Sequence, residues 1–441
     1  MPPRHPFLDR PHRTLLGLAL PVLGSLVAEP ITGLVDTAFV ARMGAEPLAA
    51  LGVGAIVLSG SFWIFNFLGV GTQTEVAQAL GRGDRAHAAR TAGLAMALAV
   101  AFGLALLVLG WAAAPAVAGL MGAEGEVAAL AAQYVRLRLL GAPAVLVTVA
   151  AFGALRGMEN MRTPLVIAVA VNVANAALDG PLILGWGGLP AWGVAGAAVA
   201  STAAQIGGGA WAGWAALRAL GRPDRLRLAE AGALLRVGGA LFVRTGLLTL
   251  FLLLATRAAT QLSAEAGAAH QAIRQVWAFT ALWLDAFAVA GQSLVAGFVG
   301  AGALASARRV ARIVVGWSLA SGALIAGLLG AATPLVVALF VPPEAVGVFG
   351  LAWAVSLVSL PLNAVTFGTD GVHWGTADYR YLAVAVAVAT GVGALGLVWI
   401  EMAGGTLAGV WVVTVAWVAI RAAFGVGRIW PGVGAAPLRR A

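Results

Sequence analysis

The sequence predicts an all-α membrane protein of about twelve transmembrane helices, arranged as two six-helix bundles related by a parallel pseudo-two-fold repeat. Three observations carry this prediction. First, 61% of the 441 residues are hydrophobic and only 10% are charged, with a mean hydropathy of +0.93. Second, apolar runs long enough to cross a hydrocarbon core of about 30 Å recur from Leu15 almost to the end of the chain, and in lipid such runs must be helical. Third, the two halves of the chain align with each other.

Short polar stretches separate the expected spans. Residues 1–13 are polar and basic and lack a signal-peptide cleavage site, so the run from Leu15 is expected to be a retained first helix. The most arginine-rich connection, residues 218–236, lies at the middle of the chain and is expected to separate two lobes, residues 1–222 and residues 223–441. The expected spans are 15–39, 48–80, 91–113, 127–155, 164–185, 193–217, 237–260, 267–299, 311–333, 347–374, 381–400 and 408–427.

The basic residues, all arginine, are unevenly distributed. They gather at both ends of the chain and in alternate loops, whereas the intervening loops carry acids such as Glu124, Glu265 and Glu344. This positive-inside pattern predicts a multi-pass protein of the cell (inner) membrane with both termini in the cytoplasm. The net charge of +9 is therefore explained by the orientation of the protein in the membrane. It does not indicate a nucleic-acid partner, because no arginine patch has the interleaved aromatic residues of a nucleic-acid-binding surface.

The repeat is visible over much of each half, at an offset of 219 residues that becomes 218 before Pro143. Residues 73–83 align with residues 292–302, sharing Gln, Val, Ala and both terminal glycines, and further matches follow: Pro143 with Pro361, Gly157 with Gly375. Because six helices separate equivalent positions, both halves have the same orientation, and the symmetry axis runs along the membrane normal. Rocking of two such bundles can expose a central cleft to either side in turn, which favours a transporter.

Two acids stand out inside the expected spans, Asp36 in the first and Asp179 in the fifth. A charge near the bilayer centre costs several kcal/mol, so an acid there indicates function. Asn172, Asn175 and Asp179 have the spacing i, i+3, i+7 and share one helix face. If Asp36 faces this stripe, the group can load and release a proton, or hold a sodium ion. The alternatives are a buried polar cluster that fastens two helices, or an Asp36 that faces water at a helix end.

Two prolines, Pro21 and Pro30, lie in the same expected helix as Asp36. Each removes a backbone hydrogen bond and favours a kink. We therefore expect a proton on Asp36 to bias a bent helix against a straight one.

The second half lacks counterparts of these acids, since Asp36 aligns with Ala255. Arginines occupy the seventh span instead, and Arg244 is expected to form an ion pair with Asp285 or to contact an anionic group. His270 is expected to be a hydrogen-bonded structural residue. We expect the acidic chemistry to be confined to the first half.

Several classes of function are excluded by composition. The chain has no cysteine and hence no thiolate metal site, and its five histidines have no ligand partners at useful spacing. It has no lysine and no phosphate-binding loop, and nothing indicates a catalytic triad. We expect no cofactor and no bound metal, and transport driven by an ion gradient and not by an enzymatic reaction.

A set of motifs extends over nearly the whole chain: LALPVL (18–23), VDTAFV (35–40), LAALG (48–52), RGMENMRTP (156–164), AALDGPLI (176–183), GVAGAA (193–198) and AAHQ (268–271). Together they resemble the multidrug and toxic compound extrusion (MATE) family. Arg244-Thr245 and the motif around Asp179 are most similar to its DNA-damage-inducible-F (DinF) branch.

The resemblance implies a two-lobed, V-shaped fold and cation-coupled export of small organic compounds, often cationic or amphipathic. It implies that Asp36, Asn175 and Asp179 form the polar site of the amino lobe, that Pro21 bends the first helix, and that Thr202 joins the site. In another branch, acids in the seventh and tenth helices form a sodium site. Here the seventh helix carries arginine and Asn363 stands at the tenth-helix position, which favours protons over sodium.

The leading interpretation is a monomeric antiporter that exchanges protons for drugs or metabolites within the lipid membrane. A flippase for lipid-linked precursors would need a larger, arginine-lined groove and often has extra helices. A channel or membrane receptor would not need two alternating states. The sequence does not identify the substrate, because an apolar cleft with few polar groups accepts many ligands.

Overall fold

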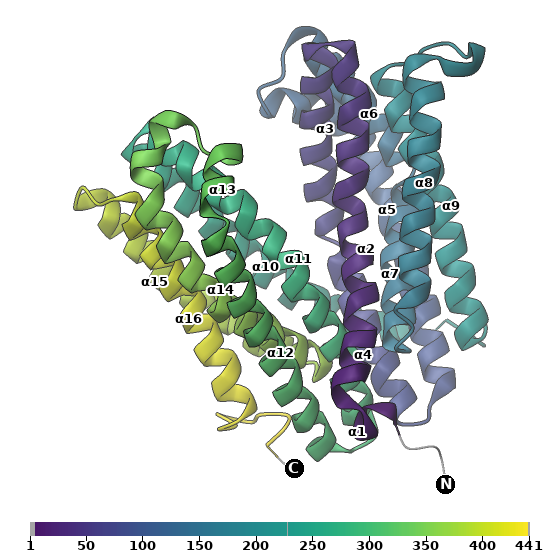
Figure 1. The fold of residues 1–441 in the computed structure, drawn as a ribbon. Coiled ribbons are helices and arrows are strands. Elements are labelled where there is room, and N and C mark those ends of the chain that lie inside the picture. The colour runs from purple at the N-terminus through teal and green to yellow at the C-terminus, as the bar shows by residue number, and fades with distance from the viewer. Residues whose placement is uncertain (1–4, 227, 440–441) are drawn as a thin grey trace. The chain divides into compact units, whose positions relative to one another are not determined.

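The computed structural model describes residues 5–226 and 228–439. In this part of the chain sixteen α-helices follow one another through short connections, and no strand is formed (Figure 1). The predicted all-helical membrane fold is confirmed.

The helices form two compact units, each described by itself. The amino unit is Leu20–Gly238, and the carboxy unit combines Met1–Ala19 with Gly239–Ala441. The lobes expected from the sequence were divided at residue 222. In the structure the division falls later, at Gly238, and residues 5–19 belong with the carboxy unit.

The amino terminus belongs to the carboxy unit because its apolar side chains are buried there. Helix α1 (Pro6–Asp9) and the start of α2 (Pro11–Val40) contribute Phe7 and Leu15, which are fully buried in one core with Phe287 and Leu294. Helix α2 therefore begins in one unit and continues into the other.

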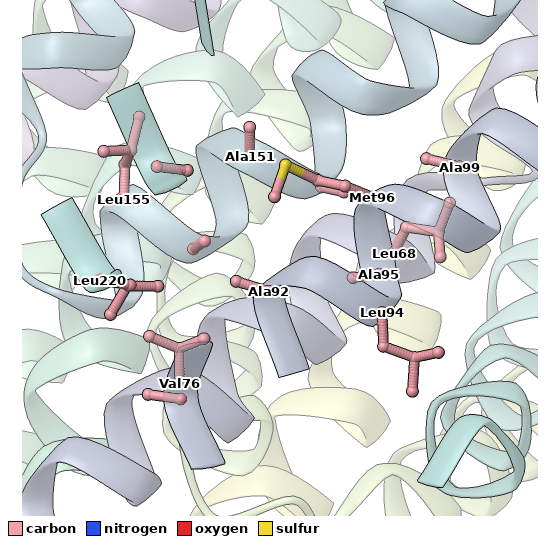
Figure 2. Close-up of a cluster of buried hydrophobic side chains, with 14 of the residues drawn as sticks. Leu68, Val76, Ala92, Leu94, Ala95, Met96, Ala99, Ala151, Leu155 and Leu220 are labelled. Atoms are coloured by element: carbon pink, nitrogen blue, oxygen red, sulfur yellow. The ribbon is translucent and has the colours of Figure 1, made fainter. Parts of the chain in front are cut away.

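Helix α7 is central to the amino unit, where it packs against α4, α5 and α9, while α8 packs along α9. Leu68 and Met96 lie with Leu155 in the hydrophobic core between these helices, and several alanines beside them let the backbones approach closely (Figure 2). The helices of this unit after α2 are α3 (Ala45–Trp63), α4 (Asn66–Gly81), α5 (Arg85–Leu120), α6 (Gly125–Leu139), α7 (Ala142–Gly157), α8 (Arg162–Leu184), α9 (Val194–Leu220) and the start of α10 (Leu228–Leu262).

Helix α14 has the central position in the carboxy unit. It packs against α11, α12 and α16, and α15 packs on the outside of α16 (Figure 1). The helices of this unit after α10 are α11 (Ala264–Gly300), α12 (Leu304–Ala331), α13 (Thr333–Phe340), α14 (Val346–Gly375), α15 (Tyr379–Met402) and α16 (Leu407–Ile429).

Each expected span coincides with a helix or a helix pair. Among the described residues ten helical segments are long and apolar enough to cross a membrane, and the pair α6 and α7, bent by 52°, makes an eleventh. The remaining expected span is α9, whose 27 residues are rich in Gly and Ala and pack on α7 and α8. Small residues at such interfaces let the helix backbones approach closely, so that packing between helices stabilises a segment that has few large apolar side chains.

The repeat is reproduced in three dimensions. A Cβ added to Gly157 would lie 2.7 Å from the carbonyl oxygen of Gln73, and one added to Gly375 would lie 2.8 Å from that of Gln292. Helices α7 and α14 thus need glycine at equivalent positions because a neighbouring backbone passes in contact with them.

Both of these helices also end in the same way. Asn160 N donates to Leu155 O at 3.0 Å after α7, and Asp378 N donates to His373 O at 2.9 Å after α14. These are Schellman bonds, which require a left-handed residue between the helix and the donor. That residue is Glu159 (φ 61°) in one unit and Ala377 (φ 59°) in the other.

Candidate functional site

The polar site of the amino unit is assembled by three helices. Asp36 lies on α2, Asn175 and Asp179 lie one turn apart on α8, and Ser201 lies on α9, which packs along α8. All four side chains are buried, with exposed fractions of 5% for Asp36 and 0% for Asp179. The alternative in which Asp36 faces water at a helix end is therefore wrong.

The amide of Asn175 joins the two carboxylates. Its Nδ2 donates to Asp36 Oδ1 and to Asp179 Oδ2, each at 2.8 Å. Both amide hydrogens are thus used, one on each acid. The two acids lie close enough to share one donor group, so two negative charges at this site would repel each other strongly in a medium that screens poorly.

The Ser201 hydroxyl completes the network. Its Oγ lies 3.1 Å from Asp36 Oδ2 and 2.8 Å from Asn175 Oδ1. A hydroxyl has one hydrogen, and the amide oxygen can only accept, so Ser201 cannot donate to both neighbours at once. When Ser201 donates to Asn175, its contact with Asp36 is a hydrogen bond only if Asp36 carries a proton. The arrangement accommodates one proton at this position.

The two acids of the site have no salt-bridge partner among the described residues. In the described part of the chain neither Asp36 nor Asp179 forms an ion pair, and Asp179 Oδ1 is buried with no hydrogen-bond partner. The charge of Arg138 acts on Asp36, but its guanidinium donates to the Gln205 side chain at 2.8 Å. A bound proton can reduce the cost of burying these acids.

The other residues expected at the site lie around it. Asn172 donates to the Ala28 carbonyl at 2.6 Å and contacts the Thr32 hydroxyl, so it ties α8 to α2 without reaching the acids. Thr202 does not join the cluster: its hydroxyl donates to the Leu137 carbonyl at 3.1 Å. Its neighbour Ser201 takes the position that the resemblance assigned to Thr202, because adjacent helical side chains point about 100° apart.

Pro21 and Pro30 both lie inside α2, which continues past them to Val40. The boundary between the two compact units falls between Ala19 and Leu20, beside Pro21. A helix that lacks a backbone hydrogen bond at that point bends at lower cost there.

A second buried charged cluster lies in the carboxy unit. Arg244 of α10 pairs with Asp370 of α14, and Arg421 of α16 lies 3.3 Å from the same carboxylate oxygen. The expected ion pair of Arg244 is therefore formed with Asp370 and not with Asp285. The expectation that acids are confined to the first half is wrong, since Asp370 is 5% exposed within an expected span.

Three charged residues of these clusters were missed although the sequence contained their signal. Arg138, Asp370 and Arg421 are each a charged residue inside a predominantly apolar expected span, the same feature that singled out Asp36. No such signal marks Ser201, because serine is ordinary in membrane helices. Its role depends on the helix that faces it.

The remaining candidates are structural in their contacts. His270 is buried, and its Nε2 lies 3.3 Å from the Thr256 hydroxyl, as expected for a hydrogen-bonded residue. Among residues 5–226 and 228–439 no group of three or more His, Cys, Asp or Glu residues is placed to hold a metal ion.

Duplicated helix bundles that cross a membrane, with an unpaired acid cluster buried in one of them, define the class of secondary transporters. The comparisons with known proteins agree. The MatE family model matches residues 21–179. Protein DETOXIFICATION 44, chloroplastic, of Arabidopsis thaliana is 32% identical over 442 residues, covering 94% of this chain and 81% of that protein. DNA damage-inducible protein F of Escherichia coli (strain K12) is 31% identical over 180 residues, or 41% of this chain and 39% of that protein.

The chain belongs to the MATE family, in its DinF-like branch, and is a transporter and not an enzyme. Solved structures share the fold. One of MATE in the bent conformation has a TM-score of 0.85 and 20% identity, covering 95% of each chain. A MOP superfamily transporter from Pyrococcus furiosus has a TM-score of 0.84, covering 95% of this chain and 96% of its own.

Proposed function

We propose that this protein exports small organic compounds, cationic or amphipathic, in exchange for protons, by alternating access across the cell membrane. The observation that carries the proposal is the buried pair Asp36 and Asp179, which is held by one amide and forms no ion pair within the described part of the chain. The Thermotoga maritima and Rhizobium meliloti relatives are each described as a probable multidrug resistance protein NorM, which supports the efflux of varied compounds.

Protons fit the site better than sodium. A sodium ion needs several oxygens directed at it. Here the carboxylates face the nitrogen of Asn175, whose hydrogens occupy one oxygen of each acid, and the oxygen of Asn175 faces the Ser201 hydroxyl. Donors in these positions repel a cation, whereas they allow a proton on either acid. Sodium remains the alternative that the experiment must exclude.

The coupling step follows from the helices that carry the acids. Ionising both Asp36 and Asp179 places two like charges across the contact of α2 with α8, and protonating one removes that repulsion. Protonation thereby changes the preferred packing of α2 against α8 and α9. Pro21 and Pro30 let α2 respond by bending. Substrate export and proton entry are coupled if the two packings give the substrate access to opposite sides of the membrane.

The proposed membrane placement follows from charge. The arginine-rich loops and ends indicate that both termini lie in the cytoplasm, and the protein is proposed to work as a monomer. A channel would conduct without exchanging protons for substrate, and a flippase for lipid-linked precursors would act on lipid and not on soluble compounds.

The test is transport by the purified protein in vesicles, with ethidium as the organic cation and with proton and sodium gradients imposed separately. We expect a proton gradient alone to drive accumulation, and addition of ethidium to release protons from the detergent-solubilised protein. Transport driven by sodium alone, or ethidium movement without counter-movement of protons, would contradict the proposal.

A further inference from the structure

The charged cluster of the carboxy unit is not balanced. Arg244 and Arg421 both contact one oxygen of Asp370, Oδ2, so two guanidinium groups share one negative charge. A balanced pair in the same unit shows the contrast. Arg428 binds Asp378 through both carboxylate oxygens, with Nε at 2.7 Å from Oδ2 and Nη2 at 3.2 Å from Oδ1. The three residues of the first cluster thus have a net positive charge. The charges of Arg428 and Asp378 balance each other, and His373 Nδ1 lies 3.7 Å from Asp378 Oδ2.

The unbalanced charge is buried. Arg244 is 8% exposed, Arg421 6% and Asp370 5%. Excluding an uncompensated charge from water is costly, and a lone guanidinium in a protein interior normally finds an anion. The Nε–H groups of both arginines have no hydrogen-bond partner in the described part of the chain. The cluster therefore has spare charge and spare donors together.

Two tryptophans hold the guanidinium groups. Arg244 lies 5.4 Å from the centre of the Trp374 ring, and Arg421 lies 4.6 Å from that of Trp417. A ring face attracts the cation and restricts its orientation, but it offers no acceptor to the N–H groups in the guanidinium plane. The donors that remain match a planar acceptor such as a carboxylate.

We infer that the Arg244–Asp370–Arg421 cluster is a binding site for the carboxylate group of a small amphipathic organic anion. The anion supplies the missing negative charge and accepts from guanidinium donors that Asp370 does not use. This inference rests on the proposed function, within which it narrows the amphipathic substrates to those with a carboxylate. The acid pair of the amino unit is not part of the site.

The test is equilibrium binding of benzoate to the purified full-length protein by titration calorimetry, with benzamide as the neutral analogue of the same shape. We expect benzoate to bind at least about tenfold more tightly than benzamide, as the loss of one charge-assisted contact predicts. Arg421→Gln is expected to weaken benzoate by about tenfold as well. Asp370→Asn is expected to tighten it, because an acid that competes for both guanidinium groups has been neutralised.

The matched control is Arg428→Gln, which breaks the neutral pair in the same unit and should leave benzoate affinity unchanged. Tighter binding by Asp370→Asn cannot result from misfolding, so it keeps the test valid even if Arg421→Gln does not fold. Equal affinity for benzoate and benzamide, or weaker benzoate binding by Asp370→Asn, would show that the cluster is only a structural ion triple. Binding of chloride without binding of benzoate would equally overturn the inference.

The two proposals fail in different ways. Asp36→Asn should bind benzoate like the unmodified protein, since the acid pair lies in the other unit. If proton-driven transport is absent while benzoate binding depends on Arg421, the proposed function fails and the anion site stands. If proton-driven ethidium transport is intact while benzoate does not bind, the reverse holds.

Discussion

The two units use one backbone plan with opposite charge. The amino unit buries two acids, Asp36 and Asp179, with a single arginine nearby, and the carboxy unit buries two arginines around the single acid Asp370. Asp370 contacts two guanidinium groups, whereas the hydrogen-bond donors to the amino-unit acids are neutral. A buried carboxylate beside cations has its charge compensated, and one beside neutral donors does not.

One contact between equivalent positions of the repeat contains an arginine in both units. Arg156 on α7 donates to the Ser25 hydroxyl on α2 at 3.2 Å in the amino unit. The equivalent positions in the carboxy unit are Trp374 on α14 and Arg244 on α10, which are also in contact. The arginine has changed helices while the contact between the helices is kept. Duplication thus preserved packing and left each unit free to acquire its own charge.

The largest expected effect concerns the acids of the amino unit. Asp36→Asn keeps the shape of the side chain but removes the group that takes up the proton, so proton-driven export should fall by about a hundredfold or more. Initial rates of ethidium transport in vesicles measure it. The exposed loop carboxylate Asp224 provides the control, and Asp224→Asn should export at the normal rate. A normal rate for Asp36→Asn would refute a coupling role for this acid.

Opposite changes in stability should distinguish the two acid environments. Asp370→Asn leaves two buried guanidinium groups without an anion and should destabilise the protein by about 3 kcal/mol. Asp179→Asn replaces one of two buried acids that have no ion-pair partner among the described residues, and it should leave stability unchanged or raise it by about 1 kcal/mol. Thermal unfolding in detergent at neutral pH measures both. Equal destabilisation by the two variants would remove the distinction drawn between the units.

A smaller difference in export rate is expected between substitutions at two neighbouring positions of α9. Ser201→Ala removes the hydroxyl that contacts both Asp36 and Asn175, so export should slow by about tenfold. Thr202→Val removes only a bond to the Leu137 carbonyl and should change export by less than about twofold. The two rates are compared in the same vesicle assay. A larger loss for Thr202→Val would return Thr202 to the site in place of Ser201.

The smallest effect is expected for the pair of Arg428 and Asp378, in which Asp378 lies outside the expected spans. Burial raises the pKa of Asp378, but contacts with His373 and Arg428 outweigh it and leave this pKa below its ordinary value. A lowered pKa stabilises the fold above the ordinary value of about 3.9, and this stability is lost as the pH falls through the folded-state pKa. Arg428→Gln should therefore have a lower free energy of unfolding than the unmodified protein at neutral pH. This difference in the free energy of unfolding should disappear at acidic pH. Unfolding curves measured across acidic pH test it. If the stability difference persists at the lowest pH, it results from lost packing of the Arg428 side chain and not from its charge.

Much of the amino-unit site was predictable from spacing. Asn175 and Asp179 are one turn apart, and the helical period alone places them on one face. Whether Asp36 meets that face depends on how α2 packs against α8, which no local pattern determines. The partner of Arg244 illustrates the same limit: Asp285 and Asp370 were both available in the sequence, and the packing of α10 against α14 selected Asp370.

The sequence by itself determined the helices, their membrane character and the repeat. Each of these follows from local hydrophobicity or from residues that recur at a nearly constant offset, such as Gly157 and Gly375. The tertiary structure alone decided that one amide serves two acids, that Ser201 and not Thr202 faces them, and that two arginines share Asp370. These arrangements depend on the rotation of each helix about its own axis, which is selected by packing against neighbours that are distant in sequence.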